Sequence, residues 1–170
     1  MALDVTKTIY DRVWAVLLAN AGFTGAFREA NRVKGQQASL RDQVQAGPGD
    51  FPKIRVHVDG PGATKVPKVF GQQSNTFTSA TVDYPVEMSV TAAIEVWHDA
   101  DNMDTNTAAE TPILAALMSG GPRFGLDYCS GVDVGRQRRE WKKDTSGTRR
   151  WCVTTPLTFR LAPYLSTLTG

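Results

Sequence analysis

Apolar side chains recur every fourth position at the start of the chain, at Val5, Ile9, Val13 and Leu17. This spacing places them on one face of an α-helix. Asp4 belongs to a residue type that caps helix N-termini, and Gly22 to one that ends helices. The sequence therefore predicts an amphipathic helix from Asp4 to near Gly22.

Two later segments alternate polar and apolar residues with the period of two that is typical of half-buried strands. The first, Lys53 to Val58, is followed at once by the turn-forming sequence Asp59-Gly60-Pro61-Gly62. The second runs from Val86 to Trp97, directly after Pro85, and residues 77–82 are a further candidate. We expect one face of these strands to be core and the other to be wetter.

A second helix is predicted after Thr105 or Thr107, with Pro112 in its first turn and an end at Gly120-Gly121-Pro122. Its length would be about three turns. Residues 126–143 and 149–161 then predict two strands, joined by the turn-rich residues 144–148. A hairpin centred on that turn pairs positions that sum to about 292, so Trp141 would face Trp151, and Cys152 would face the neighbourhood of Glu140.

These elements predict one α+β domain over residues 1–170. Its mainly antiparallel sheet would have about four to five strands, flanked by the N-terminal helix and a second short helix. Three extended arms are expected: an irregular excursion over residues 22–50, a basic hairpin arm over residues 136–150, and a C-terminal tail over residues 162–170 that is free to contact a neighbour.

Composition agrees with a single domain, since 41% of the 170 residues are hydrophobic. The formal net charge is only +2, so the overall balance demands no polyanionic partner. No apolar run approaches the roughly 20 residues needed to cross a bilayer, which predicts a soluble chain without a membrane partner. Cys129 and Cys152 lie in no metal-binding spacing and are expected to be reduced strand residues.

The sequence lacks glycine-rich phosphate loops and the common hydrolase motifs, which predicts a protein that is not an enzyme and uses no cofactor. His98, Asp99, Asp101 and Asp104 form one acidic cluster that could hold a hard cation. The interpretation we favour is that these carboxylates interact with the positive end of the following helix. An enzyme that uses a divalent ion through Asp101 and Asp104 is the weaker alternative, and His57 is interpreted as a surface residue of its strand.

The main local charge asymmetry lies on the predicted hairpin. Seven basic residues there stand against Glu140 and Asp144, with two tryptophans interleaved. The candidate contact residues are Arg136, Arg138, Arg139, Trp141, Lys142, Lys143, Arg149, Arg150 and Trp151. They could bind phosphates and stack on bases, as in a nucleic-acid-binding module. The reading we favour is a solvated arm that pairs with an acidic neighbouring subunit.

The order of elements resembles that of the tail terminator and minor tail (neck) proteins of long-tailed bacteriophages. The likeness is one of order and spacing, and it covers most of the chain. The segments that carry it are Ile9 to Trp14, Asn31-Arg32-Val33, Asp50 to Val56, Tyr84-Pro85-Val86, Ile113 to Leu117 and Gly125-Leu126. The chain departs from this plan by its long segment from Gly22 to Asp50 and by its basic hairpin.

The resemblance implies a structural virion protein that forms a six-fold ring of identical copies at the phage neck. The ring would cap the tail tube and join tail to head after assembly in the host cytoplasm. Its partners would be the tail tube protein and head–tail connector proteins, with non-specific contact with DNA in the channel. The alternatives are a different head–tail connector (head completion) protein and the nucleic-acid-binding module.

Overall fold

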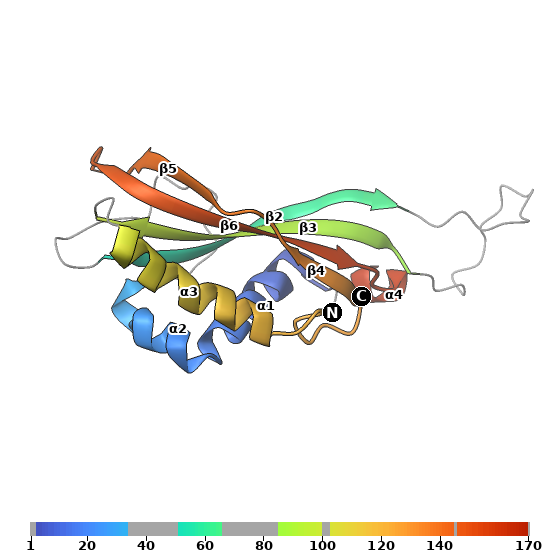
Figure 1. The fold of residues 1–170 in the computed structure, drawn as a ribbon. Coiled ribbons are helices and arrows are strands. Elements are labelled where there is room, and N and C mark those ends of the chain that lie inside the picture. Colours follow the sequence, from blue (N-terminus) through green and yellow to red (C-terminus); the bar gives the residue numbers. More distant parts are fainter. Residues whose placement is uncertain (1–2, 34–50, 66–84, 100–102, 145, 170) are drawn as a thin grey trace, which may run out of the picture.

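The computed structural model describes residues 3–33, 51–65, 85–99, 103–144 and 146–169. In these residues, one long, twisted sheet has its helices packed on one face (Figure 1). The sheet has six strands in the order β1-β2-β3-β6-β4, with β5 also paired to β6, and only the β1–β2 pair is parallel. The predicted α+β class with a mainly antiparallel sheet is confirmed.

The first helix, α1 (Val5–Leu18), follows from the four-residue apolar repeat. Asp4 caps it by accepting a hydrogen bond from the backbone N–H of Lys7 at 2.9 Å. The repeating apolar residues are all buried against the sheet. The predicted helix is confirmed, and it ends at Leu18.

The following residues form α2 (Ala21–Ala26), a 3₁₀ turn η1 (Glu29–Asn31) and the short strand β1 (Arg32–Val33). Phe23 and Phe27 are fully buried, with ring centroids 5.1 Å apart. These two aromatic anchors pull the segment into the core, so residues 22–33 differ from the extended excursion that we expected. Residues 34–50, the rest of that predicted arm, lie outside the described residues.

Three long strands form the centre of the sheet: β2 (Lys53–Lys65), β3 (Glu87–His98) and β6 (Arg149–Leu161). β3 pairs antiparallel with the other two, and the alternation predicted from Val86 onward is confirmed. β2 does not stop at Asp59 as predicted. Shifts in its register between Val58 and Pro61, and again before Thr64, carry the strand through the turn-like sequence. Residues 77–82 lie outside the described residues.

The second long helix, α3 (Met103–Ser119), has 17 residues and contains Pro112 in its interior. It is therefore longer than the helix of about three turns predicted with proline in the first turn. The buried side chains of Ala109, Ile113, Ala116 and Leu117 pack it into the core, which offsets the hydrogen bond that proline cannot donate.

The segment predicted as a single strand over residues 126–143 is divided in two. β4 (Cys129–Val134) and β5 (Arg138–Lys143) pair with successive parts of β6. The break lies at Gly135, where an added Cβ would be only 2.8 Å from Cγ of Pro156. The Gly135 N–H donates to the Pro156 carbonyl at 2.8 Å, but proline has no N–H to return a hydrogen bond, so the regular ladder is interrupted here.

The C-terminal residues pack back onto the domain and do not form the free tail expected for residues 162–170. They include the short helix α4 (Leu165–Thr169). The carbonyl of Pro163 accepts a hydrogen bond from Val86 N–H at 2.8 Å, and the carbonyl of Thr167 accepts one from Leu3 N–H at 2.9 Å. The described ends of the chain therefore lie side by side (Figure 1).

The two faces of the sheet hold different clusters of buried side chains. The helix-covered face holds the main apolar core, while the other face holds a small cluster of Trp97 and Cys152 with Phe51 packed against it. The expectation of a wetter second face is thus wrong at this end of β3, where Trp97 is 1% and Glu95 is 3% exposed. No helix among the described residues is long and apolar enough to cross a membrane.

Candidate interaction surface on the basic hairpin

The hairpin has the predicted register. Trp141 pairs with Trp151, and Glu140 pairs with Cys152. Asp144 closes the turn, where its backbone N–H donates to the carbonyl of Thr148 at 2.9 Å. The register keeps Cys152 away from Cys129, and both are free, buried cysteines as predicted.

The carboxylate of Asp144 is buried in the turn and organises it. Its oxygens accept hydrogen bonds from the Ser146 hydroxyl, the Thr148 N–H and the Arg150 guanidinium. Burial alone would raise the pKa of Asp144, but these donors outweigh burial and hold the pKa below its ordinary value. Asp144, one of the two acidic residues on the hairpin, therefore has a structural role in the turn.

Three of the seven basic residues are bound to carboxylates of their own chain. Arg139 Nη2 lies 2.8 Å from Glu110 Oε2 on α3. Lys142 Nζ lies 3.3 Å from Glu95 Oε1 and 3.2 Å from Glu140 Oε1. Arg150 pairs with Asp144 at 3.0 Å and also with Asp99. These three cations fasten β5 and β6 to the rest of the domain.

The other four basic residues remain at the surface. Arg136, Arg138, Lys143 and Arg149 are exposed and have no carboxylate partner among the described residues. The structure thus divides the seven basic residues into three that pair within the chain and these four, which we call the free cations. An unpaired concentration of positive charge favours an anionic partner.

The tryptophans of the hairpin pack on each other. Trp141 and Trp151 make an edge-on contact with centroids 5.2 Å apart, and the Arg149 guanidinium lies 5.2 Å from the centroid of Trp141. Trp141 is 40% exposed, and Trp151 is half-buried. Arg149 and Trp151 therefore contact part of the Trp141 ring, and the rest of the ring is exposed.

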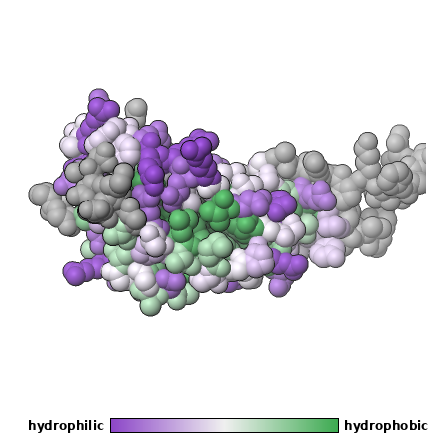
Figure 2. All heavy atoms as spheres, viewed as in Figure 1, coloured by the Kyte–Doolittle hydropathy of each residue, from purple (hydrophilic) through white to green (hydrophobic). Residues whose placement is uncertain are grey.

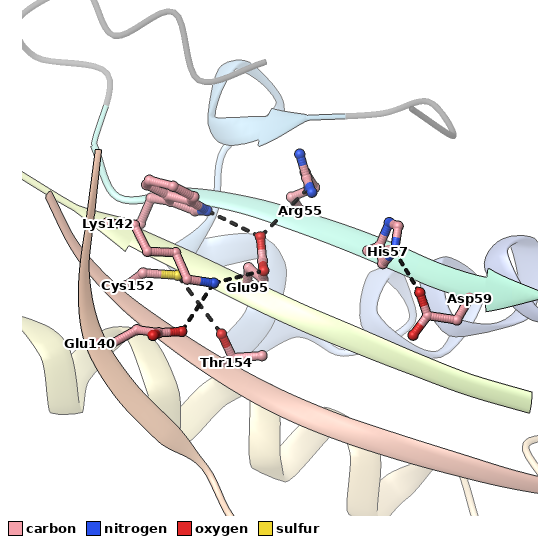
Figure 3. Close-up of polar contacts among 9 residues, drawn as sticks. Arg55, His57, Asp59, Glu95, Glu140, Lys142, Cys152 and Thr154 are labelled. Carbon is pink, nitrogen blue, oxygen red and sulfur yellow. Dashed lines mark hydrogen bonds and ion pairs between the residues drawn. The ribbon is translucent and has the colours of Figure 1, made fainter. Parts of the chain in front are cut away.

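A buried ionic cluster joins three strands on the sheet face that the helices leave open (Figure 3). Glu95 of β3 lies at its centre, between Arg55 of β2 and Lys142 of β5. Arg55 Nε is 3.6 Å from Glu95 Oε2, which also accepts a hydrogen bond from Trp97 Nε1 at 3.3 Å. Cys152 lies beside this cluster, with its Sγ 3.8 Å from Thr154 Oγ1.

The electrostatics of this cluster favour structure over nucleophilic chemistry. Burial, with the nearby charge of Glu95, raises the pKa of Cys152 to about 12, so its thiol stays protonated at neutral pH. Burial would lower the pKa of Lys142, but the negative charges around it, including Glu95 and Glu140, raise it above its ordinary value. In the sequence, Glu95 is one polar residue of an alternating strand, so nothing in the pattern indicated that it would be buried.

The acidic cluster near residue 98 shows no metal site in the part of the chain that the structure describes. His98 is buried, and Asp99 is the surface partner of Arg150. Asp101 and the side chain of Asp104 lie outside the described residues. His57 is partly exposed and lies 2.9 Å from Asp59, as expected for a surface residue.

A groove of about 460 Å³ lies at the other end of the sheet, beside the described chain ends. Its lining includes Tyr128, Pro163 and Tyr164 and the charged residues Arg123 and Asp127. Nothing in the sequence pointed to this groove, because its walls come from segments that are far apart in the chain.

The fold defined by these elements is an α+β subunit whose long sheet has helices on one face only. No family model matches the sequence, and no curated protein sequence matches it. Among solved structures, it is similar to a chain of the “Virion of native gene transfer agent (GTA) particle”, with 14% sequence identity and a TM-score of 0.50. The similarity covers 95% of this chain and 100% of that chain, so it concerns the fold as a whole.

Proposed function

We propose that this chain is a structural protein of a phage-like virion, which acts by assembling with other virion proteins and not by catalysis. The observation that carries the proposal is the fold shared over 95% of the chain with a chain of a gene transfer agent virion. Three of the candidate contact residues, Arg139, Lys142 and Arg150, form ion pairs within the fold, and the Cys152 thiol is buried and protonated, so these groups serve structure and not catalysis.

The finer proposal is a ring of about six copies at the neck of the particle. Such a ring would cap the tail tube and join tail to head, with the tail tube protein and head–tail connector proteins as neighbours. It would form in the host cytoplasm and remain in the virion. A different head–tail connector, such as a head completion protein, is the alternative role for the same subunit.

The test is the mass of the purified full chain, measured by light scattering over a concentration series and combined with electron microscopy of any oligomer. One copy has a mass of 18.5 kDa, so a ring is readily separated from a monomer. Closed rings with a central channel are the expected result. Open filaments or irregular aggregates would contradict the ring.

A second candidate function is non-specific binding of nucleic acid by the hairpin, and the four free cations are the observation that favours it. Phosphate contacts by these residues would make the logarithm of the affinity fall with the logarithm of salt, with a slope of about −0.9 per contact for duplex DNA. Four contacts therefore predict a slope of roughly −3.6. The contacts of Trp151 and Arg149 with the Trp141 ring compete with stacking of a base on it, which predicts equal or weaker binding of single strands.

Fluorescence anisotropy with a labelled duplex at low salt tests this candidate. The test variant replaces Arg136, Arg138, Lys143 and Arg149 with alanine. The matched control replaces four exposed cations elsewhere with alanine, at Lys7, Arg28, Arg123 and Arg160, and so has the same net charge. Loss of binding in the test variant alone supports the hairpin, whereas equal loss in both variants reduces the effect to overall charge.

A further inference from the structure

One side of α3 runs along the flank of the sheet where β4 and β5 lie. Glu110, Leu114 and Met118 are spaced four residues apart and so share a face of the helix. Two contacts tie α3 and the residues just after it to this flank. Glu110 accepts a hydrogen bond from Arg139 of β5 at 2.8 Å, and the carbonyl of Pro122, just beyond the helix, accepts one from the N–H of Val132 of β4 at 2.9 Å.

The apolar residues between these two ties are open to solvent. Met118 is 79% exposed, and Leu114 and Val134 are each 39% exposed. Val134 pairs with Leu157, a core residue on the helix-covered face, so its side chain lies on the same side of the sheet as α3. Figure 2 shows apolar side chains gathered over α3 and β4, below the hydrophilic residues of β5.

The same flank has an unpaired strand edge. In an antiparallel pair, every second residue points its backbone N–H and C=O toward the partner strand. Asp144 does so, since its N–H donates to Thr148, and counting back along β5 leaves the backbone groups of Arg139, Trp141 and Lys143 pointing away from β6. Among the described residues, no strand pairs with this outer side of β5. We call α3, β4 and β5 together the near flank. Its apolar centre, basic rim and open strand edge are features of protein interfaces.

At the opposite edge of the sheet, the short strand β1 covers β2 only at Ile54 and Arg55; we call β2, with α1 packed against it, the far flank. Beyond Arg55, no described strand pairs with the outer side of β2. The exposed charges described on α1, its cap and β2 are three carboxylates, Asp4, Asp11 and Asp59, and one amine, Lys7. The far flank is therefore mildly acidic, whereas the near flank has an excess of cations.

We infer that the near flank of one copy binds the far flank of a second copy of this chain. Opposite charge and two open edges on opposite sides of one sheet make the two surfaces complementary. A contact between two different surfaces repeats from copy to copy, and it closes into a ring when the rotation between copies permits. This inference rests on the proposed function and identifies the surfaces that would build the ring.

The first test compares the assembly of surface variants of the full chain by light scattering. The near-flank variant is Met118→Glu, and the far-flank variant combines Asp11→Arg with Asp59→Arg. The control is Tyr164→Glu, which places the same charge at another exposed large apolar residue, 55% exposed and outside both flanks. We expect the concentration needed for assembly to rise by about a hundredfold or more in both flank variants and to stay unchanged in the control.

Mixing the two flank variants tests the direction of the contact. Each variant keeps one intact flank, so an equimolar mixture should form heterodimers of twice 18.5 kDa and no larger species. Heterodimers in the mixture, with monomers in each variant alone, support the head-to-tail contact. Rings that persist in the flank variants would overturn this interface and leave the proposed ring standing. A wild-type chain that is monomeric at every concentration reached would overturn both.

Discussion

Replacing Glu95 should destabilise the fold, because Glu95 is the buried carboxylate at the centre of the ionic cluster. Its side chain is 4% exposed and holds β2 and β5 to β3 through Arg55 and Lys142, whose side chains are 3% and 22% exposed. Removing one partner of a buried ion pair costs about 3–5 kcal/mol, because the other charge remains in a poorly solvated place. We expect Glu95→Ala to lower the free energy of unfolding by about 3 kcal/mol, near the lower limit since Lys142 reaches solvent.

The measurement is urea unfolding followed by tryptophan fluorescence, for which Trp97 beside Glu95 is a local reporter. For a domain of this size, a loss of about 3 kcal/mol corresponds to a fall in melting temperature of roughly 10 °C. Glu95→Gln preserves the shape and one hydrogen-bond acceptor, so it should be milder and should remain folded if the alanine variant does not.

Glu140→Ala is the matched control, because Glu140 also pairs with Lys142 but its side chain is 55% exposed. Exposed pairs contribute about 0–1 kcal/mol, so this variant should be close to the wild type. A Glu95→Ala variant that loses less than about 1 kcal/mol would refute the buried-pair reasoning. So would equal losses in the two alanine variants.

Three further predictions concern single side chains. The lowered pKa of Asp144 contributes stability that is present above the pKa of the unfolded state and lost as the pH falls through the pKa of the folded state. Asp144→Asn should therefore destabilise the protein at neutral pH and have less effect in acid. Thermal melts over a pH series measure this difference. Cys152, with a pKa of about 12, should react with a thiol reagent only in denaturant, and rapid labelling of the native protein would contradict its burial. Gly120→Ala should lower the free energy of unfolding by about 1–3 kcal/mol, because its new methyl would lie 2.7 Å from Val16 Cγ1, whereas Gly25→Ala, at a helical position with open space, should not destabilise.

Local patterns predicted several elements because their causes are local. The four-residue repeat of α1 and the alternation of β3 reflect which side chains face the core, and both periods are visible in the chain. The pairing of Trp141 with Trp151 followed from the turn between them, since a hairpin register depends on few residues.

Local patterns failed where distant segments override them. The Gly-Pro sequence was expected to end β2, but the strand continues through it because it stays paired with β3. Pro112 lies inside α3 because the residues around it pack into the core. Likewise, the expected long strand is interrupted at Gly135, whose partner across the sheet, Pro156, lies 21 residues later and has no N–H to donate. These outcomes depend on contacts that no local window contains.

The candidate contact residues show the same division. The sequence by itself determined that positive charge and tryptophans would gather on one hairpin, because a hairpin brings together residues that are close in the chain. Only the tertiary structure decided which cations remain free, since Glu110, which binds Arg139, and Glu95, which binds Lys142, lie 29 and 47 residues away on α3 and β3. The physical reason is that an ion pair depends on distance in space, and the packing of helix on sheet sets that distance.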